Sequence, residues 1–318
     1  MIKSLPNTFK KALVIGANGQ DGIFLVRHLL ARGYEVAGVG RQDVPRENHA
    51  VRYRYVKSDL RKSGALSEPL WDFRPDLVFH VAAVHSSAGG IYEPVFDDML
   101  RVNVGSLHAV LEYLREWPET RLLYASSVKA FGSPLPSVIN ERTPLRNQCL
   151  YSITKNTAYH LIEYYRLSHG ALASVAFFSN HESEFRPKDF FIPKVISSLA
   201  AAIKNQRHIV EVNSLDFYRD WGSAEEYMDI AVDILDKVPG DDFVLATGHC
   251  IYARDLVRTL FNNYGFDYQT YLRERINTQE LAKPYVASLD KLQTYLGKNP
   301  RVKIYDVCKK ILAVNHGL

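Results

Sequence analysis

Short apolar runs alternate with stretches of helical periodicity through the first half of the chain. The apolar runs cover residues 11–15, 34–40, 76–83, 121–127 and 171–178. Runs of this length are typical of buried strands, whereas the stretches between them carry apolar residues at the spacing of amphipathic helices. Strand and helix in regular alternation predict an α/β fold, a Rossmann-type doubly wound parallel sheet with right-handed crossovers.

The pattern changes after Asn180. Residues 184–194, EFRPKDFFIPK, are basic, aromatic and proline-containing, which is typical of a long binding loop. Shorter elements follow, with helices predicted at 194–205, 223–237, 252–264 and 305–314 and strands at 209–212 and 243–247. We therefore expect a dinucleotide-binding domain over residues 1–180. A smaller mixed C-terminal substrate-binding lobe is expected over 181–318, with segments around 220–247 returning to the first domain.

The composition of the 318 residues is that of an ordinary globular protein. Hydrophobic residues make up 47% and charged residues 23%, and the formal net charge is only +4. Lys and Arg are scattered among acids, so we expect no nucleic-acid partner. The apolar runs are too short to span a bilayer and no signal-like segment opens the sequence, so we expect a cytoplasmic protein without a membrane partner. Cys149, Cys250 and Cys308 lack zinc-ligand spacing, so no metal is expected.

A glycine-rich turn joins the first predicted strand to the first predicted helix. It has the sequence GANGQDG. Glycines at such a turn let the backbone approach a pyrophosphate at the positive N-terminus of the helix, as in dinucleotide-binding folds. The plainer alternative is a turn without a ligand, but the strand before and the helix after favour the ligand. The expected cofactor contacts in this turn are Gly16, Asn18, Gly19, Gln20, Asp21 and Gly22.

The end of the second predicted strand bears on the choice between NAD and NADP. An acidic residue there would hydrogen-bond the ribose 2′-hydroxyl of NAD, but the chain has Gly40 followed by Arg41. Arg41 suits a 2′-phosphate and slightly favours NADP. A solvated surface arginine is the alternative, and the nearby Asp43 keeps NAD open. Asp59 is placed to contact the adenine edge, with a local helix cap as the alternative.

A tyrosine and a lysine share one face of the predicted helix 151–169. Tyr151 and Lys155 are spaced i,i+4, and Ser127 ends the strand upstream. The ammonium can lower the pKa of the phenol and hold the nicotinamide ribose, so both residues are also expected cofactor contacts. The phenol would exchange a proton with a substrate hydroxyl during hydride transfer. This spacing is often accidental, but together with the glycine turn and Ser127 it indicates an oxidoreductase.

These motifs, with others along the chain, resemble the extended short-chain dehydrogenases/reductases and, within them, the GDP-mannose 4,6-dehydratases. The resemblance is carried by GANGQDG (16–22), YSITK (151–155), NHES (180–183), IPK (192–194), RDWG (219–222), EEY (225–227) and LATG (245–248). NHES and RDWG are the most specific, because the rest of the superfamily usually varies there. The resemblance implies a Rossmann fold, a nicotinamide cofactor, a nucleotide sugar as substrate and a homodimer or homotetramer. Leu60 and Ala82 are further expected cofactor contacts.

The same resemblance implies a set of substrate contacts. They are His85, Ser86, Asn180, Lys194, Arg219 and Arg254. Asn180 would lie near the substrate phosphates, Lys194 by the nucleotide base and Arg219 at the pyrophosphate, which suits the planar fork of a guanidinium. The plainer alternatives are a helix-capping Asn180 and surface ion pairs for the two basic residues. His85 and Ser86 would line the sugar pocket, although His85 could be only a packed and hydrogen-bonded side chain.

The chain departs from the dehydratase pattern within residues 125–132. Ser127 stands where the pattern has threonine, which is conservative, but Lys129 stands where it has glutamate. By the resemblance, that glutamate is the base for the C5 proton and the acid for the C6 hydroxyl. Its loss argues against dehydration and leaves C4 redox chemistry intact. CDP-glucose 4,6-dehydratases carry lysine here after an acidic residue, which is Val128 in this chain, so elimination by Lys129 stays open.

The expected activity is NAD(P)-dependent hydride transfer at C4 of a nucleotide sugar, a GDP-linked hexose or heptose. The enzyme would be a C4 dehydrogenase or 4-keto reductase, with Ser127, Lys129, Tyr151 and Lys155 as its catalytic residues. A 4,6-dehydratase or epimerase with Lys129 as base is the alternative. A non-catalytic NAD(P)-binding sensor is the rival from another class, because the fold does not fix the function. A sensor has no need for the proton relay, which favours an enzyme.

Overall fold

A seven-stranded sheet forms the centre of the computed structural model, which describes residues 10–49, 51–85, 91–206, 208–275 and 283–318. Its strands, in spatial order, are β11 (Asp242–Leu245), β7 (Leu172–Phe178), β5 (Arg121–Ser127), β4 (Leu77–His80), β1 (Lys11–Ile15), β2 (Glu35–Gly40) and β3 (Tyr53–Lys57). Every neighbouring pair is parallel. The order changes direction between β1 and β4, so the sheet is doubly wound and the predicted fold class is confirmed.

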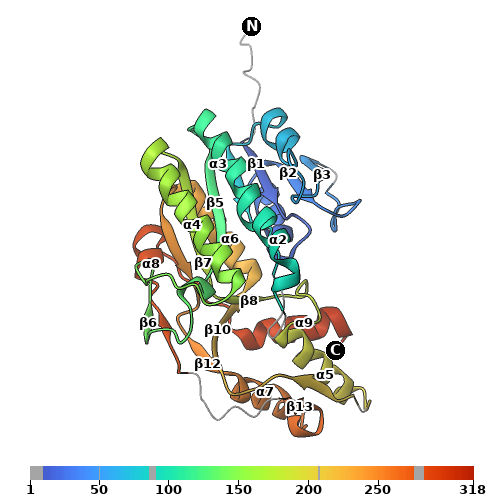
Figure 1. Cartoon of the computed structure of the whole chain (residues 1–318). Coiled ribbons are helices and arrows are strands. Elements are labelled where there is room, and N and C mark those ends of the chain that lie inside the picture. Colours follow the sequence, from blue (N-terminus) through green and yellow to red (C-terminus); the bar gives the residue numbers. More distant parts are fainter. Residues whose placement is uncertain (1–9, 50, 86–90, 207, 276–282) are drawn as a thin grey trace.

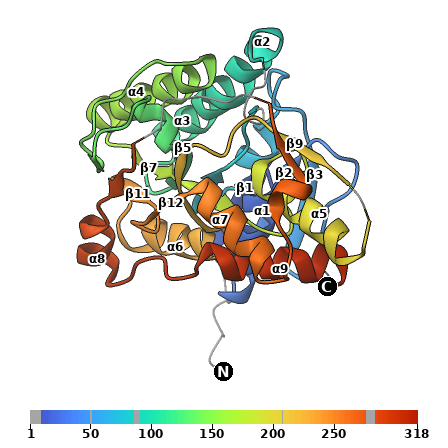
Figure 2. The same ribbon diagram turned by 90° about the horizontal axis from the view of Figure 1, so that it is seen from below.

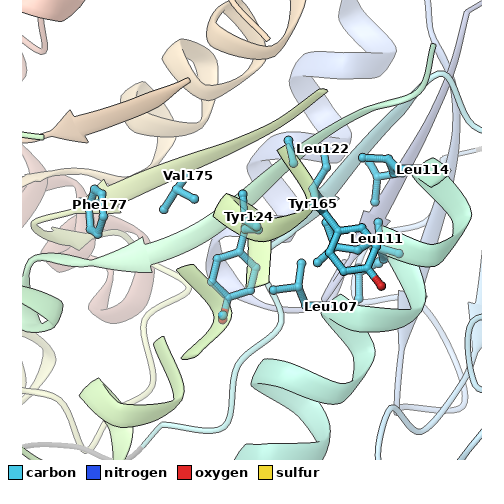
Figure 3. Close-up of a cluster of buried hydrophobic side chains, with 14 of the residues drawn as sticks. Leu107, Leu111, Leu114, Leu122, Tyr124, Tyr165, Val175 and Phe177 are labelled. Carbon is cyan, nitrogen blue, oxygen red and sulfur yellow. The ribbon is translucent and has the colours of Figure 1, made fainter. Parts of the chain in front are cut away.

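Helices cover both faces of the sheet, which explains why its strands are apolar runs without alternation. On one face lie α3 (Ser106–Glu116) and α4 (Leu150–His169), and on the other α1 (Gln20–Ala31) and α6 (Ala224–Lys237) (Figures 1 and 2). Figure 3 shows the core on the first face, where leucines of α3 and Tyr165 of α4 pack against Leu122, Tyr124, Val175 and Phe177 of the sheet.

The C-terminal part of the chain adds smaller elements below the sheet in Figure 1. The helices are α5 (Phe191–Ile203), α7 (Ala253–Asn262) and α9 (Ile304–His316), and they enclose an apolar cluster of their own. A three-stranded sheet is formed by β12 (Cys250–Tyr252), β10 (Tyr218–Ser223) and β8 (Asn180–Glu182). Two-stranded pairs are formed by β13 (Leu272–Glu274) with β9 (Val210–Val212) and by β14 (Val286–Ala287) with β6 (Val138–Ile139). Helix α8 (Asp290–Leu296) follows β14 in this part of the chain, and the short helix α2 (Phe96–Met99) lies before α3.

Three local features differ from the sequence-based expectations. Among the stretches of helical periodicity between the apolar runs, residues 101–116 are predicted as a helix, but a π-helical turn, Leu100–Gly105, precedes α3. The predicted strand 76–83 ends at His80, because the backbone N–H groups of Val81 and Ala82 both donate to the carbonyl O of Ile15. The RDWG motif forms most of β10, a strand that no apolar run announced. Across the described ranges, no helix combines the length and the apolar character needed to cross a membrane.

Candidate active site

The glycine turn lies at the C-terminal end of β1, where the strand order of the sheet changes direction. Gly16 has a φ of +100°, and a Cβ on it would lie 2.7 Å from the backbone N of Ala82. A Cβ on Gly22 would lie 2.2 Å from the carbonyl O of Gly16. Side chains are therefore excluded at both positions, and α1 approaches β1 closely. Gly19 precedes α1 without a side-chain cap, which leaves the first N–H groups of the helix to an anionic ligand.

Asn18 fixes the loop that follows β2. Its Nδ2 donates to the carbonyl O of Val44 (3.0 Å) and to the hydroxyl of Tyr55 (3.2 Å), and its Oδ1 accepts from the backbone N of Arg46 (2.8 Å). A contact between Asn18 and the cofactor stays a prediction. The structure gives this side chain a second task, which is to hold the loop that carries Arg41 against the glycine turn.

Gln20 and Asp21 connect the start of α1 to β8. Gln20 Nε2 donates to the carbonyl O of His181 (3.1 Å), and Ser183 Oγ donates to Gln20 Oε1 (2.9 Å). His181 Nε2 lies 3.0 Å from Asp21 Oδ1. Burial raises the pKa of Asp21, but the charge and hydrogen bond of His181, together with Gln20 and Arg186, lower it overall. The same contact raises the pKa of His181 against its burial. An ion pair therefore joins the glycine turn to the NHES motif.

Basic side chains cluster around Arg41 and Asp59, the residues predicted to contact the adenosine end of the cofactor. A pocket of about 630 Å³ is lined by Arg41, Lys57, Arg61 and Lys62 together with Asp59. Arg61 donates to Asp59 from its guanidinium Nη2 (2.7 Å) and from its backbone N (3.1 Å). These hydrogen bonds lower the pKa of Asp59 to about 2. Asp59 is thus held by Arg61, and its contact with the adenine stays a prediction.

The acidic residue near Arg41 is also engaged. Asp43 accepts a hydrogen bond from the ammonium of Lys57, and that bond is the main reason why the pKa of Asp43 is lowered. Leu60 is buried and lines an adjoining pocket of about 350 Å³, while Ala82 lies against Gly16. The expected cofactor contacts therefore line one edge of the sheet, from the glycine turn to this cationic pocket.

Tyr151 and Lys155 lie in the first turns of α4, which packs against β5. The helix starts at a capping box, in which Cys149 Sγ accepts from Ser152 N and Ser152 Oγ accepts from Cys149 N. Lys155 Nζ lies 5.6 Å from the centre of the Tyr151 ring. Ser127 ends β5, and its Oγ accepts from the backbone N of Lys129 (3.2 Å). The structure thus places the predicted tyrosine and lysine side by side, next to the strand that carries Ser127.

Burial dominates the charge state of this pair. It raises the pKa of Tyr151 above its usual value, with the neighbouring Tyr92 acting in the same direction, and it lowers the pKa of Lys155 to about 7. The pKa of the phenol is therefore raised overall, and its lowering by the Lys155 ammonium stays a prediction. Tyr151 carries its proton at neutral pH, whereas Lys155 is close to half-protonated.

His85 and Lys129 also lie close to Tyr151. The His85 ring meets the Tyr151 ring edge-on at 4.4 Å between centres and lies parallel to the Phe190 ring at 5.9 Å. Lys129 Nζ lies 3.3 Å from His85 Nε2 and 5.9 Å from the centre of the Tyr151 ring. Burial, with the charge of Lys129, lowers the pKa of His85 to about 3. Lys129 is partly exposed to solvent, but the loss of hydration around its ammonium lowers its pKa. The positive charges of Arg219 and Arg186 lower the pKa of Lys129 further.

The two expected phosphate contacts, Asn180 and Arg219, lie on neighbouring strands of the three-stranded sheet. Asn180 on β8 is in register with Trp221 on β10, two residues after Arg219. The Arg219 guanidinium donates to the carbonyl O of Tyr218 (2.8 Å) and lies over the Phe217 ring at 5.5 Å. Lys194 is half-buried on α5. Ser86 lies outside the described residues.

Arg254 is held by acids of the protein itself. Its guanidinium donates to Asp216 Oδ1 (2.6 Å) and to Glu274 Oε1 (2.8 Å). Two carboxylates therefore already share its positive charge, and the ion pairs fix α7 against the segments before β10 and in β13. A substrate contact of Arg254 stays a prediction that needs one of these pairs to open or to be shared.

Two residues near the site were missed by the sequence reasoning. Arg186 lies over the Phe190 ring at 3.9 Å, with its Nε 3.6 Å from the buried Glu182 carboxylate. Its signal was present, because it belongs to the basic and aromatic segment 184–194. Tyr124 gave no signal, since it sits in an apolar strand, yet its hydroxyl accepts from Lys155 Nζ (3.2 Å).

Comparison with known proteins extends the resemblance seen in the motifs. The family model for GDP-mannose 4,6 dehydratase matches residues 13–311. The chain is 30% identical over 262 residues to the GDP-mannose 4,6-dehydratase sdnI of Sordaria araneosa, covering 80% of this chain but only 48% of that protein. It is 30% identical over 252 residues to a GDP-mannose 4,6-dehydratase of Vibrio cholerae, covering 75% of this chain and 68% of that one.

A solved structure supports the fold independently of the sequence. The dTDP-glucose 4,6-dehydratase of Bacillus anthracis, determined in complex with NAD, superposes with a TM-score of 0.81 at 16% identity and covers 95% of both chains. Among the described residues, no group of three or more His, Cys, Asp or Glu side chains could hold a metal ion. By the family match over nearly its whole length, the chain belongs to the GDP-mannose 4,6-dehydratase family of the extended short-chain dehydrogenases/reductases.

Proposed function

We propose that the protein oxidises or reduces C4 of a GDP-linked hexose or heptose with NAD(P), as a C4 dehydrogenase or 4-keto reductase. One observation carries this proposal. Tyr151 and Lys155, which C4 redox chemistry needs, lie side by side. The group next to Tyr151 and His85 is the ammonium of Lys129, in place of the glutamate that dehydration needs. An ammonium that keeps its proton does not remove a proton from C5, so the chemistry stops at C4.

The residues of the glycine turn fit a dinucleotide. A Cβ would fill the space beside Gly16, and α1 presents uncapped N–H groups there, which suits a pyrophosphate. When bound, NAD(P) supplies a nicotinamide that can take or give a hydride. Tyr151, protonated at neutral pH, donates its proton to the C4 oxygen during reduction, and in oxidation it is the phenolate form of Tyr151 that takes the proton of the C4 hydroxyl. Lys155, next to β5, would bind and orient the nicotinamide ribose. Ser127, at the end of β5, would hydrogen-bond the same C4 oxygen.

The cationic pocket supports a preference for NADP. Arg41, Lys57, Arg61 and Lys62 line it, while Asp59 of the lining is engaged by Arg61 and the nearby Asp43 by Lys57. A 2′-phosphate brings negative charge into a pocket with a surplus of positive charge. Measured affinities for NADP and NAD test this preference directly.

A 4,6-dehydratase is the second candidate, and one observation favours it. Burial lowers the pKa of Lys129, which brings the neutral amine, the form that can act as a base, closer to neutral pH. The two candidates differ at C5. Reaction in D₂O places deuterium at C5 of the product only if a base reaches that carbon, so C5 deuterium would favour the second candidate over ours.

The decisive experiment is incubation with NADP or NAD and either GDP-mannose or a GDP-heptose, followed by mass spectrometry. Loss of two hydrogens supports C4 oxidation, and loss of water supports dehydration. A sensor binds the cofactor but changes no sugar, so absorbance at the NAD(P)H band excludes it if turnover occurs. The cytoplasmic location and the homodimer or homotetramer are part of the same proposal, with cell fractionation and light scattering as their tests.

A further inference from the structure

The ammonium of Lys129 lies next to the reacting group without an opposite charge. A lysine ammonium has no acceptor atom, so the 3.3 Å contact with His85 Nε2 makes the lysine the donor and the imidazole nitrogen the acceptor. The His85 ring is then neutral and carries its hydrogen on Nδ1. A neutral partner orients Lys129 but leaves its charge uncompensated.

The acids around the site are already paired with other bases. Asp21 is paired with His181, and Glu182 with Arg186. In the described part of the chain, no carboxylate lies within ion-pair distance of Lys129. The proposed diphosphate of the substrate balances the charge of Arg219, but nothing yet named balances Lys129.

The position of Lys129 indicates which part of the substrate it meets. Its Nζ lies 5.9 Å from the centre of the Tyr151 ring, and the Tyr151 hydroxyl marks the oxygen of the reacting carbon. His85 holds this ammonium in place, and the His85 ring is itself packed between the Tyr151 and Phe190 rings. A group that meets Lys129 is therefore carried by the sugar, close to C4, and not by the nucleotide.

We propose that the sugar carries a carboxylate beside the reacting carbon and that Lys129, positioned by His85, binds it. This inference rests on the proposed C4 chemistry and replaces the neutral hexose of that proposal by a nucleotide-linked hexuronate, whose carboxylate is attached at C5, next to C4. A hydroxyl in that place would leave the ammonium with neutral partners only, after the bound sugar has displaced its water. A carboxylate both balances the charge and accepts a charge-assisted hydrogen bond.

The test compares sugars that differ only in this group. The full-length chain, saturated with NAD(P)H so that C4 is not oxidised, is titrated by calorimetry with GDP-mannuronate and GDP-mannose, and separately with UDP-glucuronate and UDP-glucose. The nucleotide and the diphosphate are identical within each pair. We expect the uronate to bind about 10- to 100-fold more tightly than its hexose, as for a hydrogen bond between two charged groups.

Variants test whether Lys129 causes the preference for the uronate over the hexose. Lys129→Gln should abolish the preference by weakening the uronate much more than the hexose, whereas Lys129→Arg should retain part of the preference. Lys237→Gln is the matched control, because it removes one charge from an exposed lysine at the end of α6 and should retain the whole preference.

Each failure has its own signature. Equal affinity for uronate and hexose in the unaltered protein would overturn the carboxylate site and leave the proposed function standing. Equal weakening of both sugars in Lys129→Gln would place Lys129 at the diphosphate and would also overturn it. Failure of both pairs to bind would refute the nucleotide-sugar function itself, and the carboxylate site with it.

Discussion

Tyr124→Phe removes one oxygen atom that the buried ammonium of Lys155 uses. Lys155 Nζ donates to the Tyr124 hydroxyl (3.2 Å) and to the carbonyl O of Ala125 (2.6 Å). The Tyr124 hydroxyl in turn donates to the carbonyl O of Asn103 (2.8 Å). Because its only proton is committed to Asn103, the phenol oxygen is an acceptor for Lys155. The ring itself stays in phenylalanine, so the core shown in Figure 3 loses little packing.

The expected effect follows from the charge of the donor. A hydrogen bond to a charged group contributes about 1.5–3 kcal/mol, and one pKa unit corresponds to about 1.4 kcal/mol. The pKa of Lys155 is already depressed to about 7, because burial disfavours the charged form, while the charge of Asp21 acts in the opposite direction. The neighbouring His80 is neutral at this pH, since burial lowers its pKa to about 3. We therefore expect Tyr124→Phe to lower the pKa of Lys155 by about one to two further units.

The assay is the affinity for NAD(P) measured against pH, which needs no turnover. Lys155 is charged below its pKa, so a lower pKa means that the charge is lost at a lower pH. The midpoint at which affinity declines with rising pH should shift downward by the same one to two units. Tyr165→Phe is the matched control, because Tyr165 lies in the same core but donates to Glu112.

The reasoning would be refuted by one clear result. If Tyr124→Phe and Tyr165→Phe unfold at similar urea concentrations, and the midpoint of the Tyr124 variant equals that of the unaltered protein, the phenol oxygen does not stabilise the ammonium. A downward shift in both variants would instead assign the effect to loosening of the core.

Four further predictions concern the two ligand sites. Tyr151→Phe should lower turnover by about 10²–10⁴-fold with nearly unchanged NAD(P) affinity, and a variant that keeps more than a tenth of the rate would place the proton relay elsewhere. Arg219→Ala should weaken GDP binding in calorimetry by about 10- to 100-fold and NAD(P) binding little, so unchanged GDP affinity would remove Arg219 from the substrate site. Arg41→Ala should weaken NADP by about tenfold and leave NAD unaffected, whereas equal losses would refute the 2′-phosphate contact. Gly22→Ala should destabilise the fold by about 1–3 kcal/mol in urea unfolding, because its Cβ would lie 2.2 Å from the carbonyl O of Gly16, and unchanged stability would mean that α1 can move away.

The parts of the fold that sequence predicted are those with local signals. The apolar runs in the sequence coincide with the buried strands β1, β2, β5 and β7. These strands are apolar along their length because helices cover both of their faces. The strands of the small sheet were not foreseen, since β8 and β12 have only three residues each and β10 mixes charged, aromatic and glycine residues. Their pairing is decided by contacts between distant segments, and a local pattern carries no record of such contacts.

In the candidate site, too, the sequence predicted the residues with a local signal and missed those that depend on contacts between distant segments. Tyr151 and Lys155 share a helix face, so spacing alone brought them together. The role of Tyr124 depends on a lysine 31 residues further along the chain. Arg254 was assigned to the substrate on resemblance, yet Asp216 and Glu274 reach it from other elements. A polar side chain pairs with whatever the fold brings near it, and only the three-dimensional structure shows that choice.

The bonds between the glycine turn and β8 decide how this chain can be recombined with its relatives. Gln20 and Asp21 belong to the first strand–helix unit, but their partners His181 and Ser183 follow the boundary drawn after residue 180. A chimera joined at that boundary to a superfamily member that lacks the NHES motif would unite two halves whose buried polar groups do not match, at about 1–3 kcal/mol for each group left unpaired. The smallest exchangeable module is therefore discontinuous, and it must carry residues 16–22 and 180–183 together.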